Sequence, residues 1–313
     1  MKILYCGVCH SDLHAIKGAK SEELPLVPGH EFMGEVVEIG SSVTEFSIGD
    51  KVLVSNIVDS CRKCQPCLNQ TESYCREFPT LTYGGIDRID GTKTQGGYSD
   101  TYVADKRFVY HLPEGMNPAA AAPLLCAGIT TYSALRHWQV GPGQTVGIVG
   151  IGGLGHLAIK FARAMGAHVV AFTTSPDKIE EAKRLGAHEV ILSTDLKQMK
   201  EQAYRFDFIL DNVSQPHNMD SYLISLKMDG TLCSLGIPDN LDFKPVLLTM
   251  GRRRISSSGS GGTKEIKEML EFCQKHNIES DIELIEMKDI NQAMERLSKG
   301  DVKYRFVIDM KRL

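Results

Sequence analysis

Short apolar runs separated by turn residues fill the first third of the chain. Residues 1–113 contain runs such as 34–39 and 50–54, with glycines and polar residues between them. Runs of this length bounded by turn residues are typical of β-strands. This region is therefore predicted to be mostly β, whereas the Ala-rich apolar stretch 117–138 that follows it is predicted to be helical.

The pattern changes at residue 144, where strand-like and helix-like segments begin to alternate. The apolar runs lie at 146–149, 168–172, 189–192, 206–211 and 230–235, and segments with helical spacing lie at 154–165 and 177–185. This alternation predicts an α/β fold, a doubly wound parallel sheet with helices on both faces. A Ser/Gly-rich run at 255–263 predicts a hinge, and it is followed by a predicted helix at 264–276 and a closing strand at 303–309.

Composition and charge narrow the classes of protein that remain. With 313 residues, 42% hydrophobic and 24% charged, the chain can bury a large core without disulfides. Lys and Arg number 35 against 39 Asp and Glu, and this net charge of −4 argues against a nucleic-acid partner. No stretch approaches the roughly 20 apolar residues that span a bilayer, and residues 1–5 are too short for a signal peptide. A cytoplasmic protein without a membrane partner is predicted.

Four of the nine cysteines are crowded into one polar loop. Cys61, Cys64, Cys67 and Cys75 follow one another at short spacing within 61–75. Four thiolates from one loop can close a tetrahedral site around Zn²⁺ and leave no open position, which is the structural type of zinc site. A nucleic-acid zinc ribbon is the alternative, but it calls for basic and aromatic residues around the cysteines, and only Arg62, Lys63 and Arg76 are near. Structural zinc is the stronger interpretation.

A glycine-rich turn follows the first strand of the alternating region. Gly150-Ile151-Gly152-Gly153-Leu154-Gly155 fits the pattern G-x-G-x-x-G, directly after a predicted strand and at the start of a predicted helix. In this context Gly150 allows the tight turn, Gly152 lets the backbone approach a pyrophosphate, and Gly155 lets helix and strand pack closely. The free N–H groups of the helix N-terminus then favour phosphate. A dinucleotide-binding domain is predicted.

Three further candidate metal ligands are dispersed along the first half of the chain. Cys9 lies in the segment 7–14, His30 in 29–34 and Cys126 in 123–128. Taken singly, each has an ordinary explanation, because a buried cysteine behaves as a small apolar residue and a lone histidine is more often a surface or core residue than a ligand.

These segments together resemble a known family. The segments 7–14, 29–34, 94–98 and 123–131, with the four-cysteine loop and the glycine-rich turn, are similar to the zinc-containing medium-chain alcohol dehydrogenases, and most similar in character to their cinnamyl alcohol dehydrogenase-like branch. The similarity runs over nearly the whole chain in family order. It implies a GroES-like β-barrel catalytic domain formed by 1–125 and 264–313, and a Rossmann domain formed by 126–263. Family members carry more barrel strands ahead of residue 7, so the barrel is expected to lack its first strands.

The resemblance also implies a role for each candidate residue. Cys9, His30 and Cys126 resemble the catalytic zinc ligands, and three protein ligands leave the fourth position to water or substrate, as a catalytic zinc requires. Glu31 resembles an acid that can approach the zinc during ligand exchange. The remaining implied roles are Asp12 orienting the ligand imidazole, Ser11 and His14 as a proton relay, and Thr130, Gly236, Ile237 and Ser258 around the nicotinamide. Two zinc ions per chain and a homodimer joined through the cofactor domain are expected.

The segment after the second strand of the alternating region bears on the choice of cofactor. An NAD site usually carries an acidic residue at this strand end, whereas here the chain reads Thr173-Thr174-Ser175-Pro176-Asp177-Lys178. No carboxylate lies at the strand end, and three hydroxyls and an ammonium can bind a 2′-phosphate by hydrogen bonds and charge. Asp177 is the counter-argument, although an acid in the first turn of a helix is commonly favoured by the helix dipole alone. NADP(H) is favoured over NAD(H).

The predicted function is a zinc-dependent, NADP(H)-linked interconversion of primary aromatic or medium-chain alcohols and aldehydes. An NAD-dependent zinc polyol or secondary alcohol dehydrogenase is the alternative within enzymes. A non-catalytic zinc-binding relative is a more remote alternative, because such a protein is expected to have lost ligand or relay residues that this chain retains.

Overall fold

The computed structural model describes residues 1–21 and 24–312 and divides into two compact units. The first comprises Met1–Ile129 and Gly261–Leu313, and the second comprises Thr130–Ser260. They are named here the mixed-sheet unit and the parallel-sheet unit after their strand arrangements. The chain therefore crosses between the units at 129/130 and 260/261, whereas the family resemblance implied crossings at 125/126 and 263/264.

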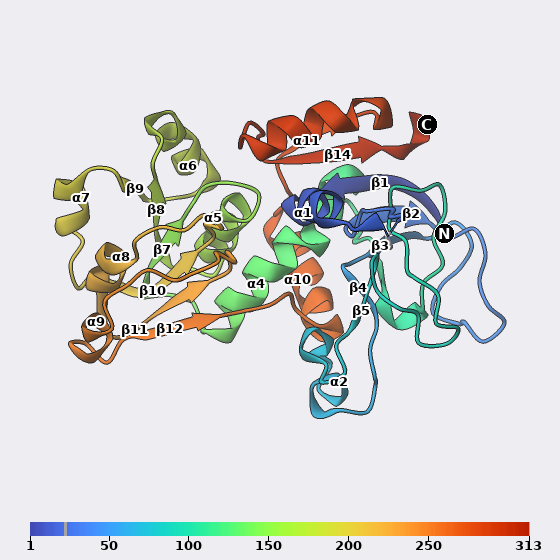
Figure 1. Ribbon diagram of the computed structural model, residues 1–313, viewed down its shortest axis with the longest axis horizontal. Coiled ribbons are helices and arrows are strands. Elements are labelled where there is room, and N and C mark those ends of the chain that lie inside the picture. Colours follow the sequence, from blue (N-terminus) through green and yellow to red (C-terminus); the bar gives the residue numbers. More distant parts are fainter. Residues whose placement is uncertain (22–23, 313) are drawn as a thin grey trace. The chain divides into compact units, whose positions relative to one another are not determined.

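The mixed-sheet unit is built on a six-stranded sheet in the order β13-β14-β1-β2-β3-β6. Its strands are β1 (Lys2–Val8), β2 (Phe32–Glu35), β3 (Lys51–Val54), β6 (Val109–His111), β13 (Ile282–Ile285) and β14 (Arg305–Asp309). Only β13 and β14 are parallel to each other, and the other neighbours are antiparallel. The last strand of the chain thus pairs with the first (Figure 1), which confirms the predicted closing strand. Residues 1–113 contain the predicted strands only in part: the strand expected at 34–39 lies at 32–35, and residues 10–18 form a helix that the pattern did not predict.

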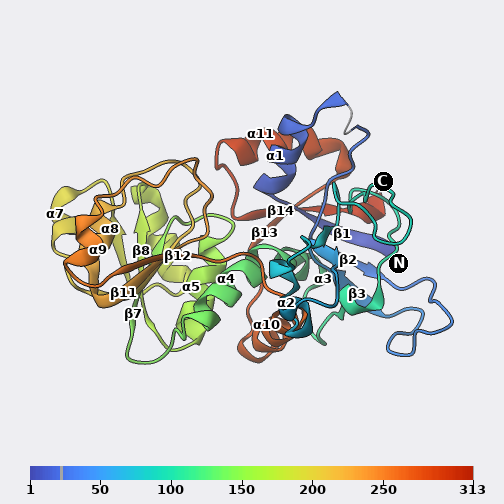
Figure 2. The same ribbon diagram turned by 60° about the horizontal axis from the view of Figure 1, so that its bottom comes forward.

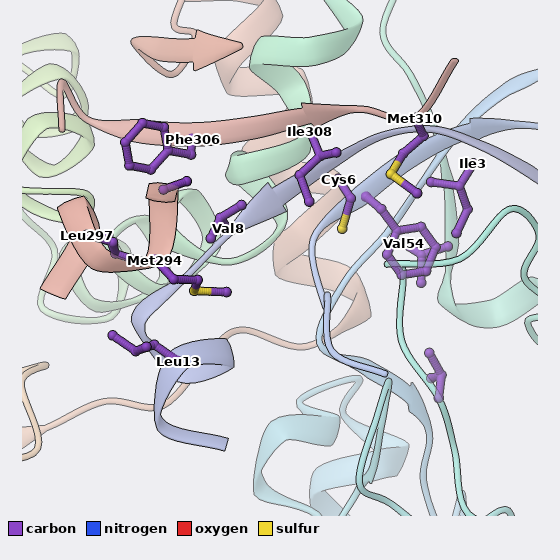
Figure 3. Packing of buried hydrophobic residues seen from close by; sticks show 13 residues of the cluster. Ile3, Cys6, Val8, Leu13, Val54, Met294, Leu297, Phe306, Ile308 and Met310 are labelled. Atoms are coloured by element: carbon purple, nitrogen blue, oxygen red, sulfur yellow. The ribbon is translucent and has the colours of Figure 1, made fainter. Parts of the chain in front are cut away.

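One apolar cluster ties two helices to this sheet. The helices are α1 (His10–Gly18), which contributes Leu13, and α11 (Ile290–Ser298), which contributes Met294 and Leu297. These side chains pack with strand residues such as Val8 and Phe306, both fully buried (Figure 3). Burying a side chain of this size contributes about 1.5–3 kcal/mol. The cluster therefore holds α1 against the sheet, and with it the residues that α1 carries.

The apolar stretch 117–138 is not one helix. It forms α3 (Pro118–Ala121), the 3-10 helix η4 (Ala122–Leu125) and α4 (Ala127–His137), with a break at Cys126. Among the described residues no single helix has both the length and the apolar content needed to cross a bilayer, while the bent pair Pro118–Leu125 and Ala127–His137 meets that test jointly, by length and composition only.

A small lobe holds the four-cysteine loop. It lies between β4 (Ile57–Asp59) and β5 (Thr80–Leu81), which pair as a two-stranded antiparallel sheet. Within the loop the chain forms only the short helix α2 (Gln65–Leu68) and the 3-10 helix η2 (Glu72–Tyr74). The lobe thus has little apolar core of its own.

The parallel-sheet unit confirms the predicted doubly wound α/β fold. Its six strands, all parallel, are ordered β12-β11-β10-β7-β8-β9. They are β7 (Thr145–Val149), β8 (His168–Thr173), β9 (Glu189–Leu192), β10 (Phe206–Asp211), β11 (Leu226–Ser234) and β12 (Arg254–Ser257), connected by α5 (Gly155–Ala164), α6 (Ile179–Leu185), α7 (Leu196–Lys200), α8 (Asp220–Ser225) and α9 (Val246–Thr249). The connecting helices pack around the sheet (Figure 2).

The strand order also fixes where a ligand is expected. The first strand, β7, lies inside the sheet, and the chain proceeds to β8 on one side and later to β10 on the other. In such sheets ligands bind outside the carboxyl ends of the strands at this switch point. The run 255–263 was predicted only as a hinge, but its first residues belong to the edge strand β12, because their backbone pairs with β11 despite a Ser-rich sequence.

Candidate active site

Three side chains from remote parts of the mixed-sheet unit meet in one group. The ligand atoms of Cys9, His30 and Cys126 all lie within 4.8 Å of one another. The sulfur of Cys126 lies 3.8 Å from the sulfur of Cys9 and 3.3 Å from Nε2 of His30. Two thiols and one imidazole form a donor set that suits Zn²⁺ and leaves one of four tetrahedral positions to another ligand. The residues therefore fit a catalytic rather than a closed metal site.

Breaks in regular structure aim these side chains at one another. Cys9 directly follows β1 and forms the N-cap of α1. Cys126 has φ −125° and ψ −75°, outside the helical region, between η4 and α4. Gly29, just before His30, has φ +97°, and a Cβ there would lie 2.7 Å from the Tyr98 ring and 2.9 Å from the Cys6 sulfur. The turn that presents His30 therefore requires glycine.

A buried carboxylate orients the imidazole. Asp12 is fully buried, and its oxygens accept hydrogen bonds from the backbone N–H of Cys9 at 2.9 Å, the N–H of Gly29 at 3.0 Å and Nδ1 of His30 at 3.0 Å. Because the carboxylate accepts from Nδ1, Nε2 is left for a metal. Burial lowers the pKa of His30, but the charge and hydrogen bond of Asp12 outweigh it and raise that pKa well above its ordinary value. Asp12 thus contacts the imidazole that it was predicted to orient, and the orienting role itself stays a prediction.

Glu31 faces an arginine that the sequence pattern did not single out. Glu31 and Arg305 are both buried and form an ion pair through Oε1 and Nη2. Nη1 of Arg305 also lies 3.8 Å from the Cys9 sulfur. Burial raises the pKa of Glu31 to about 7, against the opposing charge of Arg305. Glu31 is not one of the three grouped ligands, so its approach to a metal stays a prediction.

The buried pair retains polar atoms that nothing in the structure satisfies. Oε2 of Glu31 and Nε of Arg305 have no hydrogen-bond partner among the residues that the structure describes. A Cβ on Gly7 would lie 2.3 Å from Oε1 of Glu31, so the carboxyl is pressed against the β1 backbone. A signal for Arg305 existed in the sequence, because it is a cation directly before the apolar run Phe306-Val307-Ile308.

The proposed relay residues lie on the first turns of α1. Ser11 and His14 are exposed and three residues apart on that helix, so they share a face. Oγ of Ser11 lies 3.7 Å from the Cys9 sulfur. The structure thus brings Ser11 next to the ligand group, while the passage of a proton to His14 stays a prediction. Tyr83, whose ring centre lies 5.8 Å from that of His30, is a further neighbour that sequence reasoning missed.

The four cysteines of the lobe form a second group. Their sulfur atoms all lie within 4.8 Å of one another. Backbone N–H groups point at them: that of Cys61 at Cys75, that of Cys64 at Cys61 and that of Arg76 at Cys64, over 3.4 to 3.5 Å. The hydrogen bond from Arg76 lowers the pKa of Cys64 to about 6, and burial raises that of Cys67 to about 12. Four thiols with N–H donors directed at them suit a closed zinc site.

Two of the three cations beside the lobe cysteines are held in ion pairs. Arg62 is paired with Asp59 and Asp105, and Lys63 is paired with Glu77. This pairing weakens the alternative of a nucleic-acid zinc ribbon, which needs unpaired cations for phosphate.

One carboxylate fastens the lobe to the helix that re-enters the mixed-sheet unit. Glu72 is buried and accepts hydrogen bonds from the backbone N–H and the hydroxyl of Thr263, each at 2.9 Å. Thr263 begins α10 (Thr263–His276), so the carboxylate caps a helix N-terminus. Gly262 permits the close approach, because a Cβ there would lie 2.1 Å from the Gln70 carbonyl oxygen.

In the parallel-sheet unit, the glycine-rich turn has the geometry expected of a phosphate cradle. Gly150 follows β7 with φ +82°, and a Cβ on Gly155 would lie 1.9 Å from the Gly150 carbonyl oxygen. A Cβ on Gly152 would meet nothing within 4 Å, so the space above the turn is open. Gly153 and Leu154 lead directly into α5, whose N-terminus supplies free N–H groups. These residues fit a dinucleotide diphosphate.

The segment after β8 lies beside that turn. Nζ of Lys178 donates to the carbonyl oxygen of Ile151 at 2.8 Å, which ties the segment to the glycine-rich turn. Thr173 is buried and its hydroxyl accepts from the N–H of Ser175 at 3.1 Å, whereas Thr174 is exposed. Asp177 is exposed in the 3-10 helix η5 (Pro176–Lys178).

The other predicted cofactor contacts are divided between two places. Gly236, Ile237 and Ser258 follow β11 and β12 and so lie at the same carboxyl edge of the sheet as the glycine-rich turn. A Cβ on Gly236 would lie 2.0 Å from the Val213 carbonyl oxygen. Thr130 lies in α4 instead, at the first position of the parallel-sheet unit.

Comparison with known proteins gives consistent matches. The model of the alcohol dehydrogenase GroES-like domain matches residues 1–114, and that of the zinc-binding dehydrogenases matches residues 153–275. Aldehyde reductase YahK from Escherichia coli (strain K12) is 50% identical over 317 residues, covering 100% of this chain and 90% of the relative. Cinnamyl alcohol dehydrogenase SbCAD4 from Sorghum bicolor superposes with a TM-score of 0.93 at 43% identity, over 98% and 88% of the two chains. CAD from Helicobacter pylori, complexed with NADP(H), gives 0.91 at 38%, over 99% and 90%.

Proposed function

Because this chain belongs to the zinc-containing alcohol dehydrogenase family, we propose that it interconverts primary alcohols and aldehydes with NADP(H) as the hydride carrier. The observation that carries the proposal is the group formed by Cys9, His30 and Cys126, which joins three remote segments into an incomplete tetrahedral donor set. Zn²⁺ held there supplies a Lewis acid for the alcohol or aldehyde oxygen. The bound cofactor supplies or accepts the hydride at the carbon.

The chain's own residues orient the ligand group and move the proton. Asp12 holds the imidazole of His30 so that Nε2 faces the two thiols. Arg305 places positive charge 3.8 Å from the Cys9 sulfur, where it favours the thiolate. Oγ of Ser11, next to Cys9, would accept the hydroxyl proton of the alcohol while its own proton leaves in the direction of His14, which would pass a proton on to solvent. In the direction of aldehyde reduction the same path delivers a proton.

The preference for NADP(H) rests on the segment after β8. Its strand end carries Thr173, Thr174 and Ser175 and no carboxylate, so a 2′-phosphate meets hydroxyl and N–H donors rather than repulsion. Lys178 adds a positive charge beside the turn. The similarity to a cinnamyl alcohol dehydrogenase crystallised with NADP(H) supports the same choice.

A steady-state comparison tests both parts of the proposal. A panel of aromatic and medium-chain aldehydes is expected to be reduced with NADPH at a kcat/KM at least about tenfold above that with NADH, the worth of one charge-assisted contact. Lys178→Ala is expected to narrow this preference, whereas Lys183→Ala, on the exposed face of α6, leaves it unchanged. Equal use of both cofactors by the parent protein contradicts the NADP(H) assignment. Absence of reduction with either cofactor contradicts the reaction itself.

The parallel-sheet unit also supports a homodimer. β12 pairs on one side only, with β11, and so forms an edge of the sheet. Such edges are open to pairing with another chain, and Val246 and Met250, in and after α9, are exposed apolar side chains near it in sequence. Sedimentation equilibrium is expected to give twice the chain mass of 34.6 kDa. A monomer at micromolar concentration contradicts the dimer.

A further inference from the structure

His156 is a fully buried histidine to which none of the roles above is assigned. It follows Gly155 directly, in the first turn of α5. Its Nδ1 lies 3.1 Å from the carbonyl oxygen of Gly152, and its own backbone N–H donates to the same oxygen at 3.0 Å. A carbonyl oxygen can only accept, so Nδ1 carries the proton in this contact.

Two donors on one carbonyl fix the direction of a whole peptide unit. In a planar trans peptide the C=O and N–H bonds point in opposite directions. Because the C=O of Gly152 points into the first turn of α5, the N–H of Gly153 points the other way, out of the helix N-terminus. That is the direction from which a diphosphate approaches such a turn.

Packing against Gly152 does not hold this peptide in place. A Cβ on Gly152 would meet nothing within 4 Å, in contrast to Gly155, where it would overlap the Gly150 carbonyl. Two glycines in succession, Gly152 and Gly153, also leave the backbone with wide conformational freedom. Hydrogen bonds to the Gly152 carbonyl therefore help to restrain the peptide, and His156 supplies one of them from its side chain.

We propose that His156 is a positioning residue of the diphosphate turn: its imidazole N–H holds the Gly152–Gly153 peptide so that the Gly153 N–H faces the diphosphate of the dinucleotide. The inference rests on the proposed function only in taking a nicotinamide dinucleotide as ligand. It holds for NADP(H) and NAD(H) alike, because both carry the same diphosphate.

Replacement of His156 by residues with and without a donor tests this role. His156→Leu removes the donor, and His156→Asn keeps an amide N–H close to the place of Nδ1. His156→Met, an unbranched side chain of similar volume, replaces the Leu variant if that does not fold. Dissociation constants are measured by cofactor fluorescence for NADPH and NADH, and by calorimetry for adenosine 2′-monophosphate, which has no diphosphate.

The expected result separates positioning from general destabilisation. Without the donor, the Kd for the dinucleotide rises about five- to tenfold, the worth of one hydrogen bond, and the Kd for adenosine 2′-monophosphate stays within about twofold. His156→Asn recovers most of the loss. An unchanged dinucleotide Kd, or equal weakening of both ligands, overturns the proposal.

The same Kd measurements distinguish a failure of this proposal from a failure of the NADP(H) assignment. A wild-type protein that binds NADH rather than NADPH refutes the NADP(H) preference, and His156 is then judged on NADH. A wild-type protein that binds neither dinucleotide overturns both.

Discussion

The two cysteine groups of the mixed-sheet unit are built from similar ligands in different ways. The lobe group takes four thiols from one short loop, and backbone N–H groups point at its sulfur atoms. The dispersed group takes three ligands from the ends of β1, of a glycine turn and of η4, and buried charged side chains surround it: Asp12, Glu31 and Arg305.

This difference teaches what each site can do. A closed set of four thiolates leaves no free coordination position on a metal. The free energy of metal binding therefore stabilises the folded lobe. A set of three ligands leaves one coordination position for a reacting group. Buried charges around that position act strongly on the bound group, because the local dielectric constant is low. The number of ligands, the imidazole of His30 and the buried charged neighbours together distinguish the dispersed group from the lobe group.

The largest effect is expected from removing one of the three ligands of the dispersed group. Cys126→Ser should remove one zinc of two and lower kcat/KM by at least about 10³-fold, because a metal supplies several kcal/mol of transition-state stabilisation. Elemental analysis and steady-state kinetics measure both changes. Cys273→Ser, a buried cysteine of α10 outside either group, is the matched control and should keep both zincs. A Cys126→Ser protein with full zinc content contradicts the catalytic assignment.

Loss of a lobe ligand should instead appear in stability. Cys64→Ser is expected to lose the other zinc and to lower Tm by roughly 10 °C, in the class of large effects that follow loss of a metal site. The zinc at Cys9, His30 and Cys126 should be retained. The kcat per such zinc should stay within about tenfold of that of the parent protein. Differential scanning calorimetry with zinc analysis measures this. A variant that unfolds no earlier but is inactive would reverse the roles assigned to the two groups.

The carboxylate of Asp12 behind His30 should matter mainly for the zinc affinity of the dispersed group. Asp12→Asn keeps the shape but removes the charge that orients the imidazole, and the affinity of the dispersed group for zinc should fall about 10- to 100-fold. Competition with a chelator measures it, and the lobe zinc of the same molecule serves as internal control. Equal loss of both zincs would show a general folding defect and count against the orienting role.

The smallest effect is expected at the link between the lobe and α10. Glu72→Gln removes the charge that caps Thr263, and the free energy of unfolding should fall by about 1–3 kcal/mol, the worth of a charged hydrogen bond. The control is Glu271→Gln, an exposed residue of α10. It should change the free energy of unfolding by less than about 0.5 kcal/mol. Urea unfolding compares the two. Equal effects would remove the distinction between the anchored and the solvated carboxylate.

Sequence patterns were most informative where the structure is local. The alternation from residue 144 predicted the parallel sheet, because each buried strand and each connecting helix carries its own apolar period. The edge strand β12 was missed, since Ser256 and Ser257 have no apolar period and the strand exists only by pairing with β11. The break at Cys126 was missed for a similar reason, because apolar composition continues across it.

The sequence by itself determined the four-cysteine lobe and the glycine-rich turn, since both are short segments whose ligand atoms and N–H groups are neighbours along the chain. The dispersed group was recognised only through resemblance to a family, and tertiary structure alone decided its surroundings. Arg305 reaches Glu31 and Cys9 because β14 pairs with β1 across nearly the full length of the chain. His156 was passed over as one more helical residue, and only the direction of the Gly152 carbonyl gives it a role. Contacts between residues remote in sequence depend on how strands pair and helices pack, and no local pattern encodes them.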